Sequence, residues 1–246
     1  MGKCEQCIVR ELSSVKALNK EELIKMSETK TAFTIKKGQA IFNEGDVVNG
    51  VFCVKQGTCK IVKLGSNGKD SVLKLVNKGK ILGQHAVISE EKSSLSAIAV
   101  EDMEVCFIPK TEIMGFFNHN NKFSLEITKE ICHELKEANE ATSNHSNKNV
   151  KERLASALLH LNDIAGTTNN GELCIQLSRE EIAGMVGTAT ESCIRLLSDF
   201  NKNGLIEFYH FLGIISTKNK SFSLFFRFTA ILSYDSEFCA IGFSAE

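Results

Sequence analysis

Three polar residues, Thr190, Glu191 and Arg195, have the chemistry and the spacing to read base pairs. Arginine can donate two hydrogen bonds to O6 and N7 of a guanine, and glutamate can accept one from N4 of a cytosine. Glu191 and Arg195 stand at positions i and i+4, so a helix places them one turn apart on one face. The spacing predicts a helix that presents these side chains to a DNA major groove, with Thr190 adding a weaker contact.

The segment around them, residues 177–197, has the pattern of two short helices that meet at a tight turn. Ser178 can cap the first helix, with Glu181 as the other half of a capping box. Gly187 tolerates the left-handed conformation that such a turn needs, and Thr188 can cap the second helix. This pattern is typical of a DNA-binding helix-turn-helix. The residues that we expect to contact DNA are Arg179, Thr188, Thr190, Glu191, Ile194 and Arg195.

An ordinary helix hairpin is the alternative interpretation of this segment. In that case Glu191 would complete a capping box with Thr188 and would pair with Arg195. The charge of the region leaves this alternative open, because acidic residues balance the basic ones between residues 147 and 204. A nucleic-acid module usually carries a basic surface.

The composition is that of a globular protein without a membrane span. The chain has 246 residues, a net charge of −1, 43% hydrophobic residues and 24% charged residues. No apolar run approaches the ~18 residues of a transmembrane helix, and the charged N-terminus is unlike a signal peptide. Nine cysteines without a disulfide-like framework favour reduced thiols and a cytoplasmic protein. No catalytic triad, carboxylate pair or phosphate-binding loop is recognisable, so we do not expect an enzyme.

Glycine-bearing turns separate short β-rich runs between residues 33 and 109. This alternation of short β-rich runs and glycine-bearing turns predicts an antiparallel barrel or sandwich. The runs that we expect to be strands are residues 51–54, 58–64, 71–76 and 95–100. Before them, residues 8–29 predict short helices with a break near Asn19.

A predicted helix at residues 123–142 carries a narrow apolar stripe. The stripe consists of Phe123, Ile127, Ile131, Leu135 and Ala138. It predicts a seam between two copies of the helix in a homodimer. The alternative is a helix packed on its own β domain. The polar stretch at 141–149 is interpreted as a hinge, followed by a helix at 150–164 and a short strand at 173–177.

In order and size, these elements resemble the Crp/Fnr family of bacterial transcription regulators, over roughly residues 1–207. Three segments carry the resemblance: GQAIFNEGDVVNGVFCVKQGTCKI, KGKILGQHAVISEEKSSLSAIAVEDMEVCFIP and LSREEIAGMVGTATESCIRLL. The family implies an α+β fold with an antiparallel β-roll (a double-stranded β-helix or jelly roll), a long dimerisation helix and a C-terminal winged helix-turn-helix. It also implies a homodimer that binds double-stranded DNA, responds to a small-molecule effector and, as an activator, contacts RNA polymerase.

The resemblance divides the chain into five parts. Residues 1–30 are an N-terminal helical segment, 31–118 a sensor domain like a cyclic-nucleotide-binding β-roll, 119–145 the dimerisation helix and 146–207 the helix-turn-helix domain. Residues 208–246 are an atypical tail, rich in phenylalanine, that replaces or extends the wing. If the wing is lost, the alternative function is an effector-binding or redox-sensing module that no longer binds DNA.

The effector pocket implied by the resemblance comprises Gly83, Gln84, His85, Leu95 and Ser96. Family members that bind cyclic AMP carry a Gly-Glu pair and an Arg-Ser pair, where this chain has Gly83-Gln84 and Leu95-Ser96. Without the arginine, a phosphate loses a charged hydrogen-bond partner worth about 1.5–3 kcal/mol. We therefore expect no tight binding of cyclic AMP, and the effector is not identified by the sequence.

Oxygen-sensing members of the family hold an iron–sulfur cluster with three N-terminal cysteines and one at the end of the roll. Cys4, Cys7 and Cys106 match three of these positions, but Ser13 stands at the remaining one. A four-cysteine cluster would lack one ligand, and so would a zinc site, unless Cys132 replaces it. The cysteines interpreted as small buried hydrophobic residues are Cys53, Cys59, Cys106, Cys132 and Cys193. We therefore expect no resident metal, with an iron–sulfur cluster as the alternative.

Overall fold

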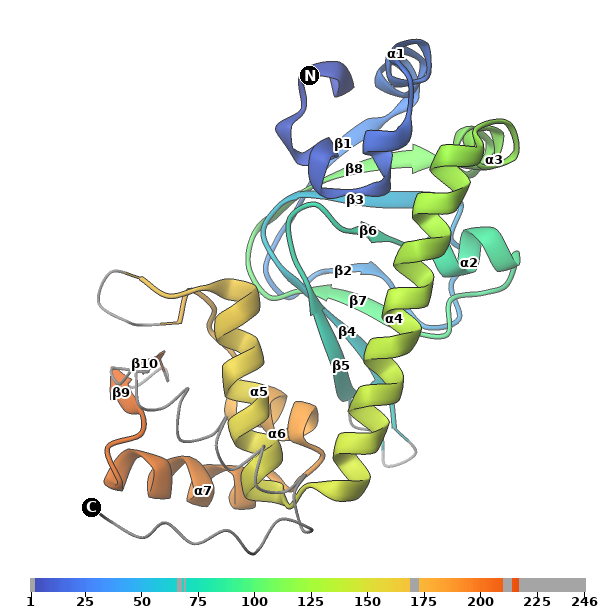
Figure 1. The fold of residues 1–246 in the computed structure, drawn as a ribbon. Helices are drawn as coiled ribbons and strands as arrows, with labels where there is room; N and C mark the ends of the chain where they lie inside the picture. Colours follow the sequence, from blue (N-terminus) through green and yellow to red (C-terminus); the bar gives the residue numbers. More distant parts are fainter. Residues whose placement is uncertain (1–2, 66–67, 69, 169–172, 210–213, 217–246) are drawn as a thin grey trace, which may run out of the picture. The chain divides into compact units, whose positions relative to one another are not determined.

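The computed structural model of this chain describes residues 3–65, 68, 70–168, 173–209 and 214–216 (Figure 1). The chain forms two units, Met1–Ser146 and Asn147–Glu246, and each is described here by itself. In the part of the chain that the structure describes, no helix is both long and apolar enough to cross a membrane.

Two four-stranded antiparallel sheets form the β-roll of the first unit. The strands are β1 (Thr31–Ile35), β2 (Ala40–Phe42), β3 (Gly50–Gln56), β4 (Cys59–Leu64), β5 (Asp70–Val76), β6 (Ile81–Leu82), β7 (Ser96–Ala99) and β8 (Met103–Pro109). Their order is β1-β8-β3-β6 in one sheet and β2-β7-β4-β5 in the other. Gly57 makes the turn between β3 and β4 with a φ of +86°, and a Cβ there would lie 2.7 Å from the carbonyl oxygen of Asp102. The α+β fold with an antiparallel β-roll is thus confirmed.

Short helical turns and one capped helix pack the N-terminal segment onto the roll. They are η1 (Cys4–Gln6), η2 (Ile8–Leu12), η3 (Ser14–Ala17) and α1 (Lys20–Thr29). Asn19 begins α1, because its side chain accepts a hydrogen bond from the Glu22 backbone in a capping box. Leu23 and Met26 of α1 are buried in the same core as Ile108 of β8. The predicted break near Asn19 is confirmed.

Three helices complete the first unit: α2 (Gln84–Ser89), α3 (Lys110–His119) and the long α4 (Asn121–Asn147). The prediction that a hinge begins at residue 141 is wrong, because α4 continues to Asn147. The polar residues of this stretch are compatible with a helix. Thr142 and Ser146 each donate a side-chain hydrogen bond to the carbonyl four residues earlier, and the stretch contains no glycine or proline to end the helix.

The second unit contains α5 (Val150–Ala165), α6 (Arg179–Val186), α7 (Thr190–Lys202) and the strands β9 (Glu207–Tyr209) and β10 (Ile214–Ser216). Buried side chains from the three helices form its core. They include Leu154, Leu158, Leu161, Ile182, Val186, Leu197 and Phe200. The strand predicted at 173–177 is not formed: its alternate residues are buried, but only an isolated bridge from Thr167 to Leu173 is present there.

Candidate functional site

A capping box and a left-handed glycine fix the predicted helix-turn-helix. The Ser178 hydroxyl oxygen accepts a hydrogen bond from the Glu181 backbone N–H at 3.1 Å, and the Glu181 carboxylate accepts one from the Ser178 backbone N–H at 2.7 Å. Gly187 ends α6 with a φ of 67°. The predicted cap and turn of the first helix are therefore confirmed.

The predicted role of Thr188 as the cap of the second helix is wrong. The N-cap of α7 is Ala189, and no side chain caps this helix. The Thr188 backbone N–H instead donates to the Ala183 carbonyl at 3.1 Å, as in the closing bond of a Schellman motif, so Thr188 belongs to the end of α6. Glu191 consequently completes no capping box.

The outward face of α7 presents two side chains of opposite charge. Glu191 and Arg195 are exposed, Ile194 is 45% exposed beside them, and Thr190 is half-buried. Within the described residues, neither Glu191 nor Arg195 makes an ion pair or a side-chain hydrogen bond, so the pairing required by the alternative interpretation is not formed. Both side chains are available to an external partner.

Arg179, which we also expected at the DNA, has a different setting. It is half-buried at the start of α6, and burial lowers the pKa of its guanidinium, although the neighbouring Cys193 thiol acts in the opposite direction. Its charge is therefore less accessible than that of Arg195.

Arg153 of α5 donates hydrogen bonds to the turn after α6, and the sequence analysis did not identify this residue. Its guanidinium donates from Nε to the Val186 carbonyl at 2.8 Å and from Nη2 to the Gly187 carbonyl at 3.4 Å. It also donates from Nη1 to the Lys148 carbonyl at 2.9 Å. One planar group thus satisfies carbonyls at the end of α6, which otherwise lack helical partners.

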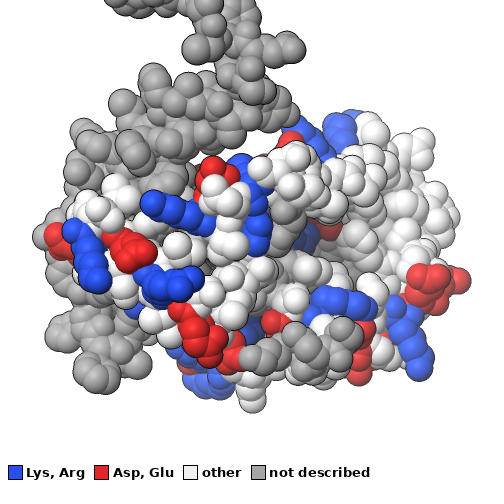
Figure 2. Space-filling model, turned by 90° about the horizontal axis from the view of Figure 1, so that it is seen from below, with Lys and Arg blue, Asp and Glu red and all other residues white. Residues whose placement is uncertain are grey.

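The face seen in Figure 2 has mixed charge. Lysine and arginine side chains alternate with aspartate and glutamate, and the described residues form no unbroken basic patch on it. Affinity for a polyanion would therefore depend on a few placed cations.

A two-stranded hairpin follows α7, where the sequence analysis expected an atypical tail. β9 and β10 are antiparallel, with Tyr209 opposite Ile214 and Glu207 opposite Ser216. The rest of the predicted tail, 210–213 and 217–246, lies outside the described residues.

In the β-roll, a carboxylate from α4 contacts the first half of the predicted effector pocket. Gln84 donates from Nε2 to one oxygen of Glu134 at 3.2 Å, and a ring nitrogen of His85 lies 2.6 Å from the other oxygen. Lys74 of β5 completes the group at 3.0 Å from Glu134. Burial alone would raise the pKa of Glu134, but the hydrogen bond with His85 and the charge of Lys74 together hold it below the ordinary value. Gly83, with a φ of +86°, begins α2 at this point.

The other half of the predicted pocket makes separate contacts. The Ser96 hydroxyl oxygen accepts a hydrogen bond from the Glu44 backbone N–H at 2.8 Å, and the Glu44 carboxylate pairs with Lys63. Leu95 beside it is half-buried. Among the described residues, no hydrogen bond links Leu95 or Ser96 to Gln84 or His85.

The apolar stripe of α4 is divided between two environments. Phe123 and Ile127 are 0% and 2% exposed in the core of their own unit, and Ile131 packs against that core. The prediction that these residues face a second copy is therefore wrong for Phe123 and Ile127, because the same periodicity serves intramolecular packing. Leu135 is 61% exposed, and Ala138 is also exposed.

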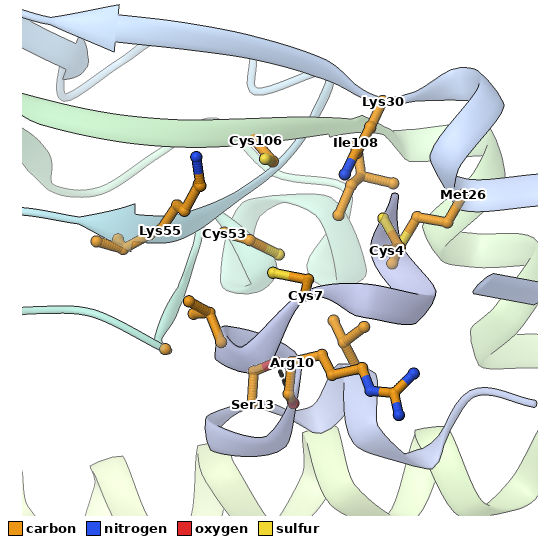
Figure 3. A pocket seen from close by; sticks show the side chains of 14 residues that line it. Cys4, Cys7, Arg10, Ser13, Met26, Lys30, Cys53, Lys55, Cys106 and Ile108 are labelled. Carbon is orange, nitrogen blue, oxygen red and sulfur yellow. Dashed lines mark hydrogen bonds between the residues drawn. The ribbon is translucent and has the colours of Figure 1, made fainter. Parts of the chain in front are cut away.

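A cavity of about 40 Å³ lies between the N-terminal segment and the roll, and four cysteines line it. Cys4 and Cys7 come from the N-terminal segment, Cys53 from β3 and Cys106 from β8. Cys53 and Cys106 are direct partners in the register of the two strands. In Figure 3 the side chains of Cys7 and Cys53 extend toward one another. Ser13 also lines this cysteine cavity.

Cys53, a cysteine that the sequence analysis did not group with Cys4, Cys7 and Cys106, lines the same cavity. The interpretation as a small buried residue accounts for part of its setting, since burial raises its pKa. The charges that Cys106, Cys4 and Cys7 carry when ionised raise that pKa further. Cys132, the substitute suggested by the sequence, is exposed on α4 and does not line the cavity.

Comparisons with known proteins agree with both units. A model of the cyclic nucleotide-binding domain matches residues 32–120, and one of the Crp-like helix-turn-helix domain matches residues 152–218. Electron transport regulator A of Shewanella oneidensis is 28% identical over 83% of this chain and 82% of its own. The fumarate and nitrate reduction regulatory protein of Vibrio cholerae is 26% identical over 82% of each chain.

A solved structure extends the likeness to the fold. The transcriptional regulator TTHA1359 of Thermus thermophilus, of the CRP/FNR family, superposes with a TM-score of 0.68 at 19% identity. The match covers 80% of this chain and 98% of that one. With a roll of the cyclic-nucleotide-binding type followed by a Crp-like helix-turn-helix, this chain belongs to the Crp/Fnr family of transcription regulators.

Proposed function

We propose that the chain acts as a homodimer that binds a two-fold symmetric DNA site and reads it with α7. The observation that carries this proposal is the pair of exposed side chains on α7, Glu191 and Arg195, which have no partner within the described residues. The N–H groups of Arg195 can donate to O6 and N7 of a guanine, and the carboxylate of Glu191 can accept a hydrogen bond from N4 of a cytosine. The hydrogen bonds of Arg153 support the proposal, because they fix the end of α6 and the turn that leads to α7.

The exposed part of the α4 stripe supports a dimer. Leu135 is a large apolar side chain that is 61% exposed, and Ala138 follows it on the same face. A second copy of α4 would cover these residues in a two-fold interface, which repeats the same patch on both subunits. The seam that we propose begins at Ile131, which is partly buried against the core of its own unit.

The contacts of Glu134 favour an effector other than a cyclic nucleotide. A ligand phosphate beside Gln84 and His85 would meet the Glu134 carboxylate, and like charges repel. The Gln84 oxygen Oε1 is buried and has no hydrogen-bond partner among the described residues. An effector with a hydroxyl or amine donor would satisfy that oxygen.

Selection of binding sites from random duplex DNA with the purified full-length chain tests the DNA proposal. We expect enrichment of a palindrome with a TGA-like core in each half, the half-site centres lying about 34 Å, one helical turn, apart. Recovery of unselected sequences after repeated rounds would contradict it.

Sedimentation at micromolar concentration tests the dimer. Leu135→Glu should convert a wild-type dimer into monomers, because it buries charge in the two-fold seam. Lys136→Glu is the matched control, since it adds an acidic residue at the next position, where the wild-type side chain is 70% exposed. A monomeric wild type, or a dimeric Leu135→Glu variant, would refute the proposed seam.

A further inference from the structure

Another cavity lies within the N-terminal segment, between its short helical turns and the start of α1. This N-terminal cleft has a volume of about 380 Å³, which is within the range of pockets that hold small molecules. Its lining consists of Glu5, Arg10, Lys16, Leu18, Lys20 and Leu23. None of these residues belongs to a strand of the roll, so the N-terminal cleft is separate from the predicted effector pocket.

The charges that line the N-terminal cleft do not balance. Arg10, Lys16 and Lys20 are cations, and Glu5 is the one acidic residue of the lining. A phosphate monoester carries about 1.5 to 2 negative charges at pH 7 and would neutralise this surplus. A monocarboxylate carries a single negative charge and would leave part of the surplus uncompensated. The lining therefore favours a phosphate over a carboxylate.

Arg10 is held in position by the chain itself. Its Nη1 donates to the Glu5 carbonyl at 2.9 Å, and its Nε donates to the carboxylate of Glu11 at 2.8 Å. Among the described residues, Nη2 has no hydrogen-bond partner, and Glu11 does not line the cleft. In Figure 3 the guanidinium of Arg10 extends away from the cysteines. Because this side chain is already ordered, a ligand that binds it loses less conformational entropy than one that must immobilise it.

Lys16 connects the N-terminal cleft with α4. Its ammonium lies 3.0 Å from the carboxylate of Glu126, which also pairs with Lys129 at 2.7 Å. Lys16 can therefore turn to a bound phosphate without leaving the Glu126 carboxylate unpaired. The Lys16 side chain is 47% exposed, so this exchange requires no rearrangement of the core.

Lys20 is the cation of the cleft that is most available to a ligand. It is exposed at the first residue of α1, and it makes no ion pair or side-chain hydrogen bond within the described residues. The buried side chains of Leu18 and Leu23 supply the apolar part of the lining. The cleft thus offers charge to a phosphate group and apolar contact to a small organic body.

We propose that the N-terminal cleft binds a small organic phosphate, whose phosphoryl oxygens are contacted by Arg10, Lys16 and Lys20. Arginine recognises phosphate through its fork of N–H donors, and lysine does so as a mobile point charge. Leu18 and Leu23 contact the organic part of the ligand. The proposal is independent of DNA binding and of dimerisation, and its test uses no DNA.

Isothermal titration calorimetry of the full-length chain with phenyl phosphate at low salt tests the proposal. Benzoate has the same ring with a single negative charge, and inorganic phosphate has no ring, so both should bind more weakly than phenyl phosphate. Lys20→Gln should weaken the binding of phenyl phosphate by about fivefold, the upper range for an exposed ion pair. Lys37→Gln is the matched control, because it removes an exposed lysine between β1 and β2 that does not line the cleft. It should leave the dissociation constant unchanged.

Arg10→Gln should weaken the binding of phenyl phosphate further than Lys20→Gln, because it removes the ordered guanidinium. It also removes the hydrogen bond to the Glu5 carbonyl, so circular dichroism must establish that this variant is folded. If it is not, Lys16→Gln takes its place. Three results would overturn the proposal. They are a wild type that binds phenyl phosphate no more tightly than about 10 mM, equal affinities for phenyl phosphate and benzoate, and a Lys20→Gln variant that binds as tightly as Lys37→Gln.

Discussion

Replacing Arg195 by alanine should remove discrimination at one guanine of each half-site without weakening the fold. The side chain is exposed and makes no ion pair or hydrogen bond within the described residues, so its loss should change the free energy of unfolding by less than about 0.5 kcal/mol. A bidentate contact with guanine is worth about 1–3 kcal/mol. A symmetric dimer loses two such contacts, about 2–6 kcal/mol of binding free energy. The dissociation constant should therefore increase by a factor of roughly 30 to 10⁴.

The assay is a fluorescence-anisotropy titration at fixed salt, with the selected palindrome and with a palindrome whose guanine is replaced. The wild type should prefer the first DNA, and Arg195→Ala should bind both about equally. Lys202→Ala is the control, because it removes the same charge from the exposed last turn of α7. It should weaken both complexes alike and flatten the salt dependence. An Arg195→Ala variant that keeps the wild-type preference for guanine would refute direct readout by this residue.

Three further predictions concern Arg153, Glu134 and the binding of cyclic AMP. Arg153→Ala should lower the free energy of unfolding of the second unit by about 1–3 kcal/mol, measured by urea denaturation, because it leaves carbonyls at the end of α6 without a donor. The pKa of Glu134 is lowered in the folded chain, so its ionised form stabilises the fold above the ordinary value of 4.5, and this contribution is lost as the pH falls through the folded value. Glu134→Gln should therefore be less stable than the wild type at neutral pH and should lose less stability on acidification; parallel curves for the two proteins would contradict this. Calorimetry should detect no binding of cyclic AMP tighter than about 10 micromolar, roughly 7 kcal/mol.

Features set by neighbours in the chain were predictable from the sequence. The capping box of Ser178 and the left-handed Gly187 depend on residues within one or two turns, and both are present. An antiparallel β domain followed from strand-length runs between glycines, since each turn glycine limits where a strand can end, whereas its form as a roll was implied by the resemblance to the family. Thr188 was misassigned because two capping patterns compete for it, and the closing bond of α6 takes its N–H.

Features set by contacts distant in sequence were not predictable. A single cysteine such as Cys53 has no local pattern, and only the pairing of β3 with β8 places it opposite Cys106. The stripe from Phe123 to Leu135 has one periodicity but two environments, and periodicity does not distinguish a partner helix from the chain's own core. Arg153 was missed because its acceptors are backbone carbonyls, which every sequence supplies.

The guanidinium of Arg153 joins two places that lie far apart in the sequence of the second unit. Its three acceptors are the carbonyls of Lys148, the residue after α4 ends, and of Val186 and Gly187, at the end of α6. The first residues of the second unit and the turn after α6 are therefore joined through one planar group. Within the second unit, a displacement of the backbone at Lys148 would therefore strain the hydrogen bonds at the end of α6, although 38 residues of sequence separate Lys148 from Val186.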